Sequence, residues 1–275
     1  MKKAKVLFIS QEINPYLTET DISGISRKLP QGIQESGKEI RTFMPRFGCI
    51  NERRNQLHEV IRLSGMNLII DDSDHPLIIK VASIQAARMQ VYFIDNEEYF
   101  QRKHVFRDAK KKFYKDNEDR MIFFCRGVLE TVKKLGWNPD IIHCHGWMTS
   151  LVPLYIKTAY SDDPIFKDSK VVYSVYNNDI EENLEGALTK KILMEGIKTS
   201  DLSDYKDISN VGLNIAAMNW ADAVVKGSEN LPLAITQHMD SLDKPVLDHF
   251  SSENFVSAYS ELYDGLLQPE TVLAN

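Results

Sequence analysis

Residues 6–9 read VLFI, and residues 39–44 read EIRTFM. The first run is continuously apolar, which is typical of a parallel strand that is buried on both faces. Between the two runs, apolar residues recur at helical spacing from Ile22 to Ile33, and Gly37 stands where that helix should end. Pro45 closes the second run. Strand, helix and strand in this order predict a βαβ unit, the opening of a doubly wound α/β sheet.

The chain from about Leu57 to Phe93 has a different character. Short apolar stretches alternate here with turn residues such as DDSD at 71–74. This pattern predicts a small antiparallel excursion from the parallel sheet. Its expected strands are Val60–Leu63, Leu68–Ile70, Leu77–Val81 and Val91–Ile94.

Alternation of helices and strands resumes in the second half of the chain. Wide apolar faces predict helices, and β-branched runs predict further parallel strands. The expected helices are Asp119–Leu135, Leu151–Thr158 and Ala216–Asp222, and the expected strands are Asp140–Cys144, Lys170–Val175 and Ala223–Val225. A mostly parallel sheet with helices therefore accounts for most of the sequence.

The last part of the chain predicts a separate helix. Pro232 and Pro245 indicate a linker. A serine-capped segment follows, in which apolar residues from Phe255 to Leu267 recur on one helical face. Because such a face must pack on another part of the protein, we expect residues 1–240 to form one domain, and residues 241–275 to form a linker and a helix that packs back on it.

Composition and charge limit the function classes. Of 275 residues, 43% are hydrophobic, which is enough for a folded core, and the formal net charge is -6. An acidic chain lacks the basic surface that binds nucleic acid or an anionic membrane. Three cysteines without a CxxC pair indicate a reducing compartment. Since no run approaches the roughly 18 apolar residues of a membrane-spanning helix and the opening reads as a strand, we expect a soluble, cytoplasmic protein.

No metal or cofactor is indicated. His143 and His145 face the same side of a strand, but no nearby acid or cysteine has the spacing of a metal site. The first strand is not followed by a glycine-rich dinucleotide fingerprint. Ser150 and Ser174 lack the context of a nucleophile elbow, so a hydrolase is not supported.

Three motifs carry a resemblance to a known family. Met44–Gly48 reads MPRFG, Asp95–Phe100 reads DNEEYF, and Leu135–Trp147 reads LGWNPDIIHCHGW. In order and spacing, they are similar to M/L-P-R-Y-G, D-N-P-E-Y-F and L-G-W-x-P-D-V-V-H-A-H-D-W of bacterial glycogen synthases and plant starch synthases. The likeness runs from the first strand to about Ile235.

The resemblance implies the amino-terminal, Rossmann-like half of a two-domain glycosyltransferase of the B type, which extends α-1,4-glucans with ADP-glucose. In that family the reaction takes place in the cleft between two Rossmann-like domains, and the second domain binds most of the nucleotide. We expect that second domain to be absent from this chain. The terminal helix is then expected to be the one that crosses back to the first domain.

The family's phosphate cradle is replaced in this sequence. The family pattern K-T-G-G-L-A-D aligns with residues 18–24, which read TETDISG. The lysine that meets the donor's phosphates falls on Thr18, and the paired glycines fall on Thr20 and Asp21. At an effective dielectric constant near 20, two like charges about 4 Å apart repel by roughly 4 kcal/mol. The substitutions therefore oppose the binding of a diphosphate.

Two further strand ends also depart from the family. The family's H-D-W-H becomes His145-Gly146-Trp147-Met148, so the aspartate and the second histidine are replaced by Gly146 and Met148. The family's V-F-T-V-H-N becomes a strand in which Tyr176 takes the place of the histidine and Asn177 follows. A tyrosine of pKa about 10 donates a hydrogen bond but does not change its protonation near neutral pH.

These residues define the candidate site. Trp147 is the candidate for stacking on a sugar, because it lies past the carboxyl end of a strand, where open α/β sheets bind ligands. No catalytic residue is assigned, since the family positions are replaced at Thr18, Gly146, Met148 and Tyr176. The expected lining of the donor or sugar crevice is Thr20, Asp21, His145, Trp147, Tyr176 and Asn177.

Three hypotheses follow. The first is a domain of α-1,4-glucan metabolism that does not transfer glucose alone and binds an α-glucan, a maltooligosaccharide or a partner protein. The second is an active glucosyltransferase whose nucleotide-binding domain comes from a separate glycosyltransferase chain. The third is a structural or regulatory protein without a sugar ligand.

Overall fold

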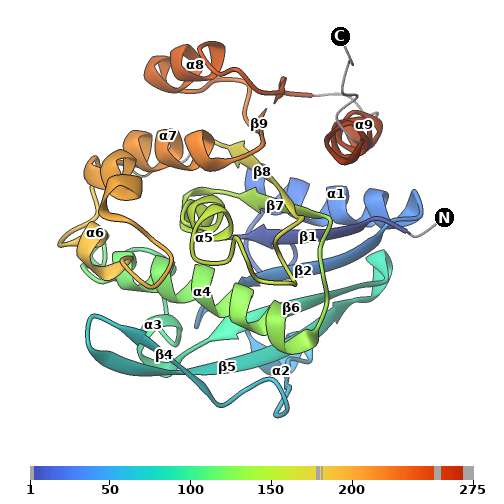
Figure 1. The fold of residues 1–275 in the computed structure, drawn as a ribbon. Helices are drawn as coiled ribbons and strands as arrows, with labels where there is room; N and C mark the ends of the chain where they lie inside the picture. Colours follow the sequence, from blue (N-terminus) through green and yellow to red (C-terminus); the bar gives the residue numbers. More distant parts are fainter. Residues whose placement is uncertain (1–2, 178–179, 181, 251–254, 269–275) are drawn as a thin grey trace, which may run out of the picture.

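A computed structural model describes residues 3–177, 180, 182–250 and 255–268, which build one mixed sheet with helices on both faces (Figure 1). The 10-stranded sheet has the order β10-β9-β8-β7-β1-β2-β6-β5-β3, and β4 pairs with β5. The parallel strands are β1 (Lys5–Ser10), β2 (Glu39–Pro45), β6 (Met89–Asp95), β7 (Ile141–His145), β8 (Lys170–Val175), β9 (Ala223–Lys226) and β10 (Val246–Leu247). The antiparallel strands are β3 (His58–Glu59), β4 (Met66–Ile70) and β5 (Ser73–Ile84).

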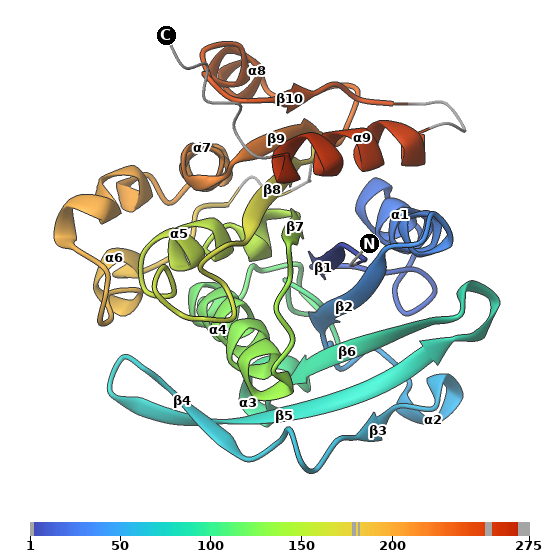
Figure 2. The ribbon, with the colours of Figure 1, turned by 45° about the vertical axis from the view of Figure 1, so that its right-hand side comes forward.

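Two hydrophobic cores cover the two faces of the sheet. Alternate residues of β1 point to opposite sides, so that Leu7 and Ile9 join one core while Val6 and Phe8 join the other. The larger core includes the helices α4 (Asn117–Leu135), α5 (Val152–Lys157), α7 (Asn210–Trp220) and α8 (Leu233–Asp240). The smaller core lies under α1 (Asp21–Glu35) and α9 (Phe255–Leu267), which Figure 2 shows together. The short helices are α2 (Glu52–Asn55), α3 (Glu97–Phe100) and α6 (Leu188–Lys191), with 3-10 turns at Gln85–Ala87, Trp147–Thr149 and Thr199–Lys206.

The predicted α/β architecture is confirmed. β1, α1 and β2 form the expected parallel βαβ unit, with Lys5 opposite Glu39 and Ile9 opposite Phe43. The excursion between β2 and β6 is antiparallel, as its turn residues predict. α4 ends where expected, because Gly136 adopts a left-handed conformation with φ of 60° that a glycine takes at no steric cost.

Two expected elements differ from the structure. The predicted strand Val60–Leu63 is a turn that follows β3, since Leu63 N–H bonds to Val60 O and Ile61 is exposed. The predicted linker between Pro232 and Pro245 contains α8, and β10 then adds an edge strand beside β9. The composition of residues 60–63 and 232–245 does not reveal these structures, because each depends on which side of the segment packs against the rest of the protein.

The helix α9 packs on α1. A Cβ added at Gly32 would lie 2.5 Å from Val256 Cγ2, so the missing side chain lets the two helices approach closely. Lys38 Nζ pairs with Asp264 at 3.0 Å, and Tyr263 is fully buried. The division of the chain at residue 240 stays a prediction, as does the origin of α9 as a crossing helix.

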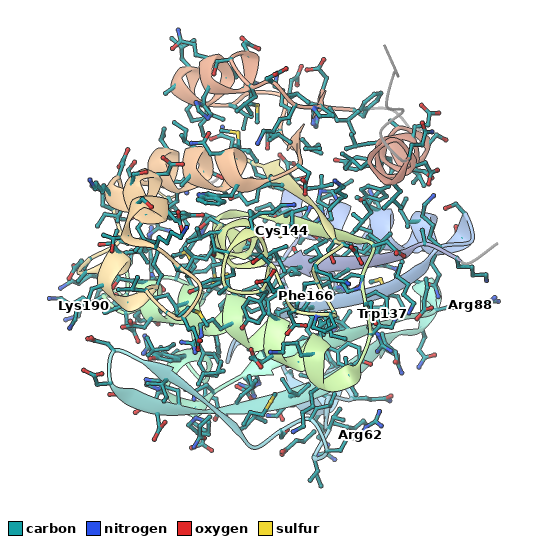
Figure 3. All side chains as sticks on the ribbon, in the orientation of Figure 1. Arg62, Arg88, Trp137, Cys144, Phe166 and Lys190 are labelled. Carbon is teal, nitrogen blue, oxygen red and sulfur yellow. The ribbon has the colours of Figure 1, made fainter. Side chains whose placement is uncertain are left out.

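Most apolar side chains lie in the interior, and most charged side chains lie at the surface. Figure 3 places Cys144 and Phe166 within the body of the protein, whereas Arg62, Arg88 and Lys190 point outward. Cys125 and Cys144 are buried free thiols, and Cys49 is an exposed one. Among the described residues, no helix is long and apolar enough to cross a bilayer.

Candidate functional site

The carboxyl ends of three parallel strands meet at one edge of the sheet. In the register of the sheet, Ser10 of β1 lies opposite His145 of β7, which lies opposite Ser174 of β8. The residues that follow these strands are therefore brought together, as expected for an α/β sheet. Gln11 and Tyr176 belong to this group.

The start of α1 is capped by the protein's own side chains. Thr20 Oγ1 accepts a hydrogen bond from Ser23 N–H at 3.0 Å, and Ser23 Oγ accepts one from Thr20 N–H at 2.8 Å. The Thr20 hydroxyl in turn donates to Glu12 Oε2 at 2.7 Å. A helix start can hold a phosphate through its free N–H groups. Here the capping box uses part of that capacity, and a carboxylate lies beside it.

A small cavity, which we call the strand-end crevice, lies next to this helix start. Its volume is about 250 Å³, and its lining includes Glu12, Thr20, Asp21, Phe106, Arg107 and Asn177. Ser228 Oγ donates to Asp21 Oδ2 at 3.2 Å and accepts from Asn177 N–H at 3.1 Å. Residues after β8 and β9 are thereby linked to the first turn of α1.

The charges of the strand-end crevice oppose an anionic ligand. Glu12 and Asp21 contribute two carboxylates. The guanidinium of Arg107 donates to both carboxylate oxygens of Glu182, at 2.9 and 2.6 Å, so its charge is already compensated. Asp21 is exposed, and screening by water makes its repulsion of a phosphate smaller than the roughly 4 kcal/mol of a partly buried pair.

Thr18 stands where the family resemblance implies a lysine. The residue is exposed, and its carbonyl oxygen accepts a hydrogen bond from Ser23 Oγ at 2.9 Å. Its hydroxyl can donate a hydrogen bond, but a threonine lacks the positive charge with which a lysine attracts a diphosphate.

Gln11 occupies the space that a side chain at position 146 would need. Gly146 has φ of 87°, a conformation that disfavours other residues, and a Cβ added there would lie 2.5 Å from Gln11 Cδ. Gln11 N–H donates to His145 O at 3.2 Å, and Gln11 Oε1 accepts from Met148 N–H at 3.4 Å. The aspartate that the family resemblance implies at position 146 does not fit this arrangement.

His145 and Tyr176 form a buried, uncharged pair. His145 Nδ1 and the Tyr176 hydroxyl are 2.7 Å apart, and the two side chains are 0% and 2% exposed. Burial lowers the pKa of His145 to about 3 and raises the pKa of Tyr176 well above 10. Both shifts favour the uncharged form of each group near neutral pH. Gly227 provides the room for the tyrosine, because a Cβ there would lie 2.7 Å from Tyr176 Cδ1.

His143 belongs to the contact with α9. Its Nδ1 lies 2.6 Å from the Tyr263 hydroxyl and its Nε2 lies 2.7 Å from Ser174 Oγ. The rings of His143 and His145 are 4.0 Å apart. Burial, and the repulsion that two protonated rings at this distance would have, lower the pKa of His143 well below 6.5. Within the described part of the chain, no group of three or more metal-binding side chains could hold an ion.

Trp147 is not available for stacking on a sugar in this conformation. The indole is 1% exposed and packs against Phe106 and Phe113, with ring centroids 5.1 and 6.3 Å away. The expectation that Trp147, His145 and Tyr176 line an open crevice therefore differs from the structure. Met148 is also fully buried.

The lining of the strand-end crevice overlaps with the residues expected at a donor or sugar crevice. Thr20, Asp21 and Asn177 lie in its wall, and that the cavity holds a donor or a sugar stays a prediction. Gln11 and Glu12 also line it and are not among the expected residues. Their position directly after β1 could have indicated Gln11 and Glu12, because ligand-binding residues of α/β sheets gather there. Phe106 and Arg107 had no such signal, because they come from a segment that follows α3.

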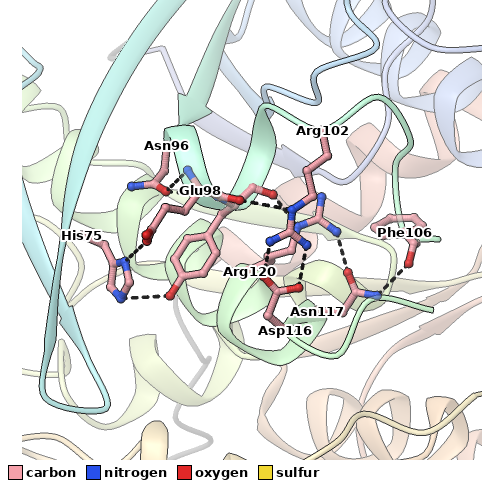
Figure 4. A network of polar contacts seen from close by, with 9 residues as sticks. His75, Asn96, Glu98, Arg102, Phe106, Asp116, Asn117 and Arg120 are labelled. Carbon is pink, nitrogen blue, oxygen red and sulfur yellow. Dashed lines mark hydrogen bonds and ion pairs between the residues drawn. The ribbon is translucent and has the colours of Figure 1, made fainter. Parts of the chain in front are cut away.

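The family motifs DNEEYF and MPRFG have structural roles nearby. Figure 4 shows the network around the first of them, in which Asn96 caps α3 and His75 Nε2 lies 3.0 Å from the Tyr99 hydroxyl. Arg120, fully buried, donates to Tyr99 O at 2.7 Å and to Asn117 Oδ1 at 2.5 Å. The pair Arg102 and Asp116 fastens the segment that leads to Phe106. This network orders the wall of the crevice.

Arg46 of MPRFG belongs to a second group of charges. Lys80 Nζ pairs with Asp95 Oδ2 at 2.9 Å and with Glu52 Oε1 at 2.5 Å, and Arg46 also pairs with Glu52. Asp95 is fully buried, and desolvation raises its pKa. These ion pairs tie β2, β5 and β6 together and stabilise the fold.

Comparison with known proteins identifies the relatives of this chain. The family described as starch synthase catalytic domain matches residues 5–244. The glycogen synthase of Chlorobium limicola is 36% identical over 225 residues, which cover 82% of this chain and 45% of that protein. The glycogen synthase of Chlorobaculum parvum is 38% identical over 265 residues, which cover 96% of this chain and 52% of that protein.

A solved structure shows the same fold. The catalytic domain of starch synthase IV from Arabidopsis thaliana, bound to ADP and acarbose, matches with a TM-score of 0.70 and 17% identity. The match covers 90% of this chain and 52% of that chain. The chain thus spans about half the length of the relatives that it matches.

Proposed function

Because the chain belongs to the family of the starch synthase catalytic domain, we propose that it is a glycosyltransferase-like domain of α-1,4-glucan metabolism that binds an α-glucan and does not itself transfer glucose. Retaining glucosyl transfer requires a cradle for the diphosphate leaving group and groups that stabilise charge at the anomeric carbon. The proposal is that this chain has neither.

The capped start of α1 is the observation that carries the proposal. Where the family resemblance implies free backbone amides and a lysine, this chain has Thr20 hydrogen-bonded to Ser23 and Glu12. The only carboxylate in the first turn of α1, Asp21, compensates the positive end of the helix dipole. A diphosphate would have to displace these groups and approach two carboxylates.

The chemistry of the strand-end crevice suits a neutral ligand better than an anionic one. Carboxylates such as those of Glu12 and Asp21 accept hydrogen bonds from hydroxyl groups, and Phe106 adds an apolar surface. A glucan offers many hydroxyl groups and no charge. The names of the relatives, glycogen synthase and starch synthase, support a glucan as the ligand class.

The test is a transfer assay with radiolabelled ADP-glucose and glycogen. We expect the purified full chain to incorporate no label above a heat-inactivated sample, while the Chlorobium limicola relative, assayed beside it, incorporates label. Turnover by this chain alone contradicts the proposal. Affinity electrophoresis in gels that contain glycogen checks the second part: retarded migration is expected, and unretarded migration leaves a protein partner in place of the glucan.

A second candidate function is an active ADP-glucose:α-1,4-glucan glucosyltransferase whose nucleotide-binding domain comes from another chain. Its support is the open crevice of about 250 Å³ that persists at the strand ends. The partner would have to supply the cations that positions 18–21 lack. The same assay, repeated with cell extract from which the protein has been depleted and then added back, separates the two: label that appears only on add-back supports the second function.

A further inference from the structure

A second cavity lies against α4, α5 and α7. Its volume is about 790 Å³, within the range of ligand sites in proteins. Its walls come from four parts of the chain. These are Glu130 and Lys133 of α4, residues 157–163 at and after the end of α5, residues 194–201, and Trp220 at the end of α7. We call this cavity the Trp220 basin.

The Trp220 basin and the strand-end crevice lie at opposite ends of the sheet. Lys157 Nζ, in the basin wall, pairs with Asp222 Oδ2 at 2.6 Å, and the same oxygen accepts from Val171 N–H at the beginning of β8. The crevice instead includes Asn177, which lies beyond the last residue of β8. A ligand in one cavity therefore leaves the other free.

The polar groups of the basin wall are held in place by one another. Tyr160 donates to Glu130 Oε1 at 2.6 Å, and Lys133 Nζ pairs with Asp163 at 3.1 Å. Gly196 brings the opposite wall close, because a Cβ there would lie 2.8 Å from Ala159 Cα and its φ is 89°. Groups positioned in this way bind a ligand without paying the entropy of ordering themselves.

The charges of the basin favour a neutral ligand. Four of the eight charged groups that line it, namely Glu130, Lys133, Lys157 and Asp163, have a partner of opposite sign, and acids outnumber lysines. The acids are Glu130, Asp162, Asp163, Glu195 and Asp201, and the lysines are Lys133, Lys157 and Lys198. A phosphate-bearing ligand meets net repulsion here, whereas hydroxyl groups find both donors and acceptors.

Trp220 gives the basin an aromatic surface. It is only partly buried, whereas Trp137 and Trp147 are 4% and 1% exposed. An indole presents a large, rigid apolar face, and such faces anchor ligands whose remaining groups are polar. Carbohydrates have this character, because the C–H groups of a pyranose ring form an apolar patch between their hydroxyl groups.

We propose that the Trp220 basin binds a neutral α-glucan chain by stacking on Trp220, at a site separate from the strand-end crevice. The choice of an α-glucan rests on the function proposed above. The location of the site rests on the cavity, its paired charges and its partly exposed indole. The basin would thus attach the protein to a glucan at the end of the sheet opposite the strand-end crevice.

Tryptophan fluorescence tests the site directly. Because Trp220 is the only partly exposed tryptophan of the three in the sequence, titration with maltoheptaose should change the emission of the wild type in a saturable way. We expect Trp220→Ala to weaken binding, measured by calorimetry, by about tenfold or more, as loss of a central aromatic anchor does. Trp220→Phe retains a ring and should weaken it less. Circular dichroism spectra that match the wild type establish that each variant is folded.

A variant of the strand-end crevice distinguishes failure of the basin site from failure of the proposed glucan binding. Asp21→Arg places a large cation in the strand-end crevice and leaves the basin untouched, so any maltoheptaose binding in the crevice should weaken while the part of the binding that Trp220→Ala removes should be unchanged. Binding that Asp21→Arg abolishes and Trp220→Ala leaves intact overturns the basin site, while glucan binding itself stands. A wild-type protein that binds neither maltoheptaose nor glycogen overturns the glucan part of the proposed function and this site together.

Discussion

The strand-end crevice and the Trp220 basin lie at opposite ends of the same sheet and differ in the volume they leave open. At the crevice, the side chains of Gln11 and Thr20 use the hydrogen-bonding groups that a ligand would need, and about 250 Å³ remains. At the basin, polar groups pair within the walls and leave about 790 Å³ open. A fold shared with the starch synthase catalytic domain does not by itself determine what each cavity binds, because function depends on the residues placed on the fold.

Acid should affect the crevice end of the molecule most. The pKa values of His143 and His145 are lowered in the folded state, so at pH values below about 6.5 the unfolded chain binds more protons and stability falls as the pH falls. Between pH 7 and pH 5, we expect His145 alone, with a folded pKa of about 3, to cost on the order of 2 kcal/mol, measured by urea denaturation. His143 adds to the loss in the same direction.

His145→Gln provides the control for this pH dependence. The variant should lose part of the slope, since one of the two buried histidines no longer titrates. Asp95 and Glu118, whose pKa values burial raises, act in the opposite direction as the pH falls toward their own range. A wild-type protein with equal stability at pH 7 and pH 5 contradicts the buried, neutral histidine pair.

Restoring the family's aspartate at position 146 should damage the protein. Gly146→Asp places a Cβ against Gln11 at a backbone angle that suits glycine, and we expect a loss of about 3 kcal/mol in the free energy of unfolding without any gain of transfer activity. Adding Gln11→Ala to this variant should recover part of the loss, because the overlap is removed while the backbone strain remains. Full stability of Gly146→Asp alone would show that Gln11 does not hold this space.

Removing a tyrosine hydroxyl should cost more stability beside His143 than in the wall of the Trp220 basin. Tyr263→Phe leaves His143 Nδ1 buried without its partner, and we expect a cost of about 1–3 kcal/mol. Tyr160→Phe removes the hydroxyl that donates to Glu130 in the basin wall, but that carboxylate is 29% exposed and water replaces the bond, so the cost should stay below about 1 kcal/mol. Thermal denaturation of the two variants side by side measures the difference.

The sequence predicted the fold better than the site. Continuous apolar runs located β1, β7 and β8, because burial on both faces leaves a local pattern. The same reasoning placed Thr20, Asp21 and Asn177 at the crevice, since they follow the parallel strands or begin the first helix. These features depend on residues that are close together in the chain.

What the sequence could not show depends on residues far apart in the chain. Trp147 is buried because Phe106 and Phe113 fold over it from a segment that precedes α4. Gln11 fills the space at Gly146 only because β1 and β7 are neighbours in the sheet. The sequence places Trp220 in a helical pattern, but its cavity arises where residues 157–163 and 194–201 meet around it.

The smallest expected effect is that of a single charge in the strand-end crevice. Asp21→Asn removes one carboxylate and retains the hydrogen-bonding shape, so the stability of the protein should change by less than about 0.5 kcal/mol. Any residual affinity for ADP should rise by less than about fivefold, because Asp21 is exposed and its field is screened. Glu12→Gln is the matched variant, because it removes the other carboxylate of the crevice.

Calorimetric titration of the wild-type protein with ADP tests the central claim most directly, because ADP carries the diphosphate that the strand-end crevice is inferred to reject. The account predicts no saturable heat at millimolar ADP, under conditions in which the catalytic domain of starch synthase IV from Arabidopsis thaliana, which was solved bound to ADP, gives a full binding curve. Saturable ADP binding that Asp21→Arg or Gly146→Asp alters would place a nucleotide at the start of α1 and contradict it.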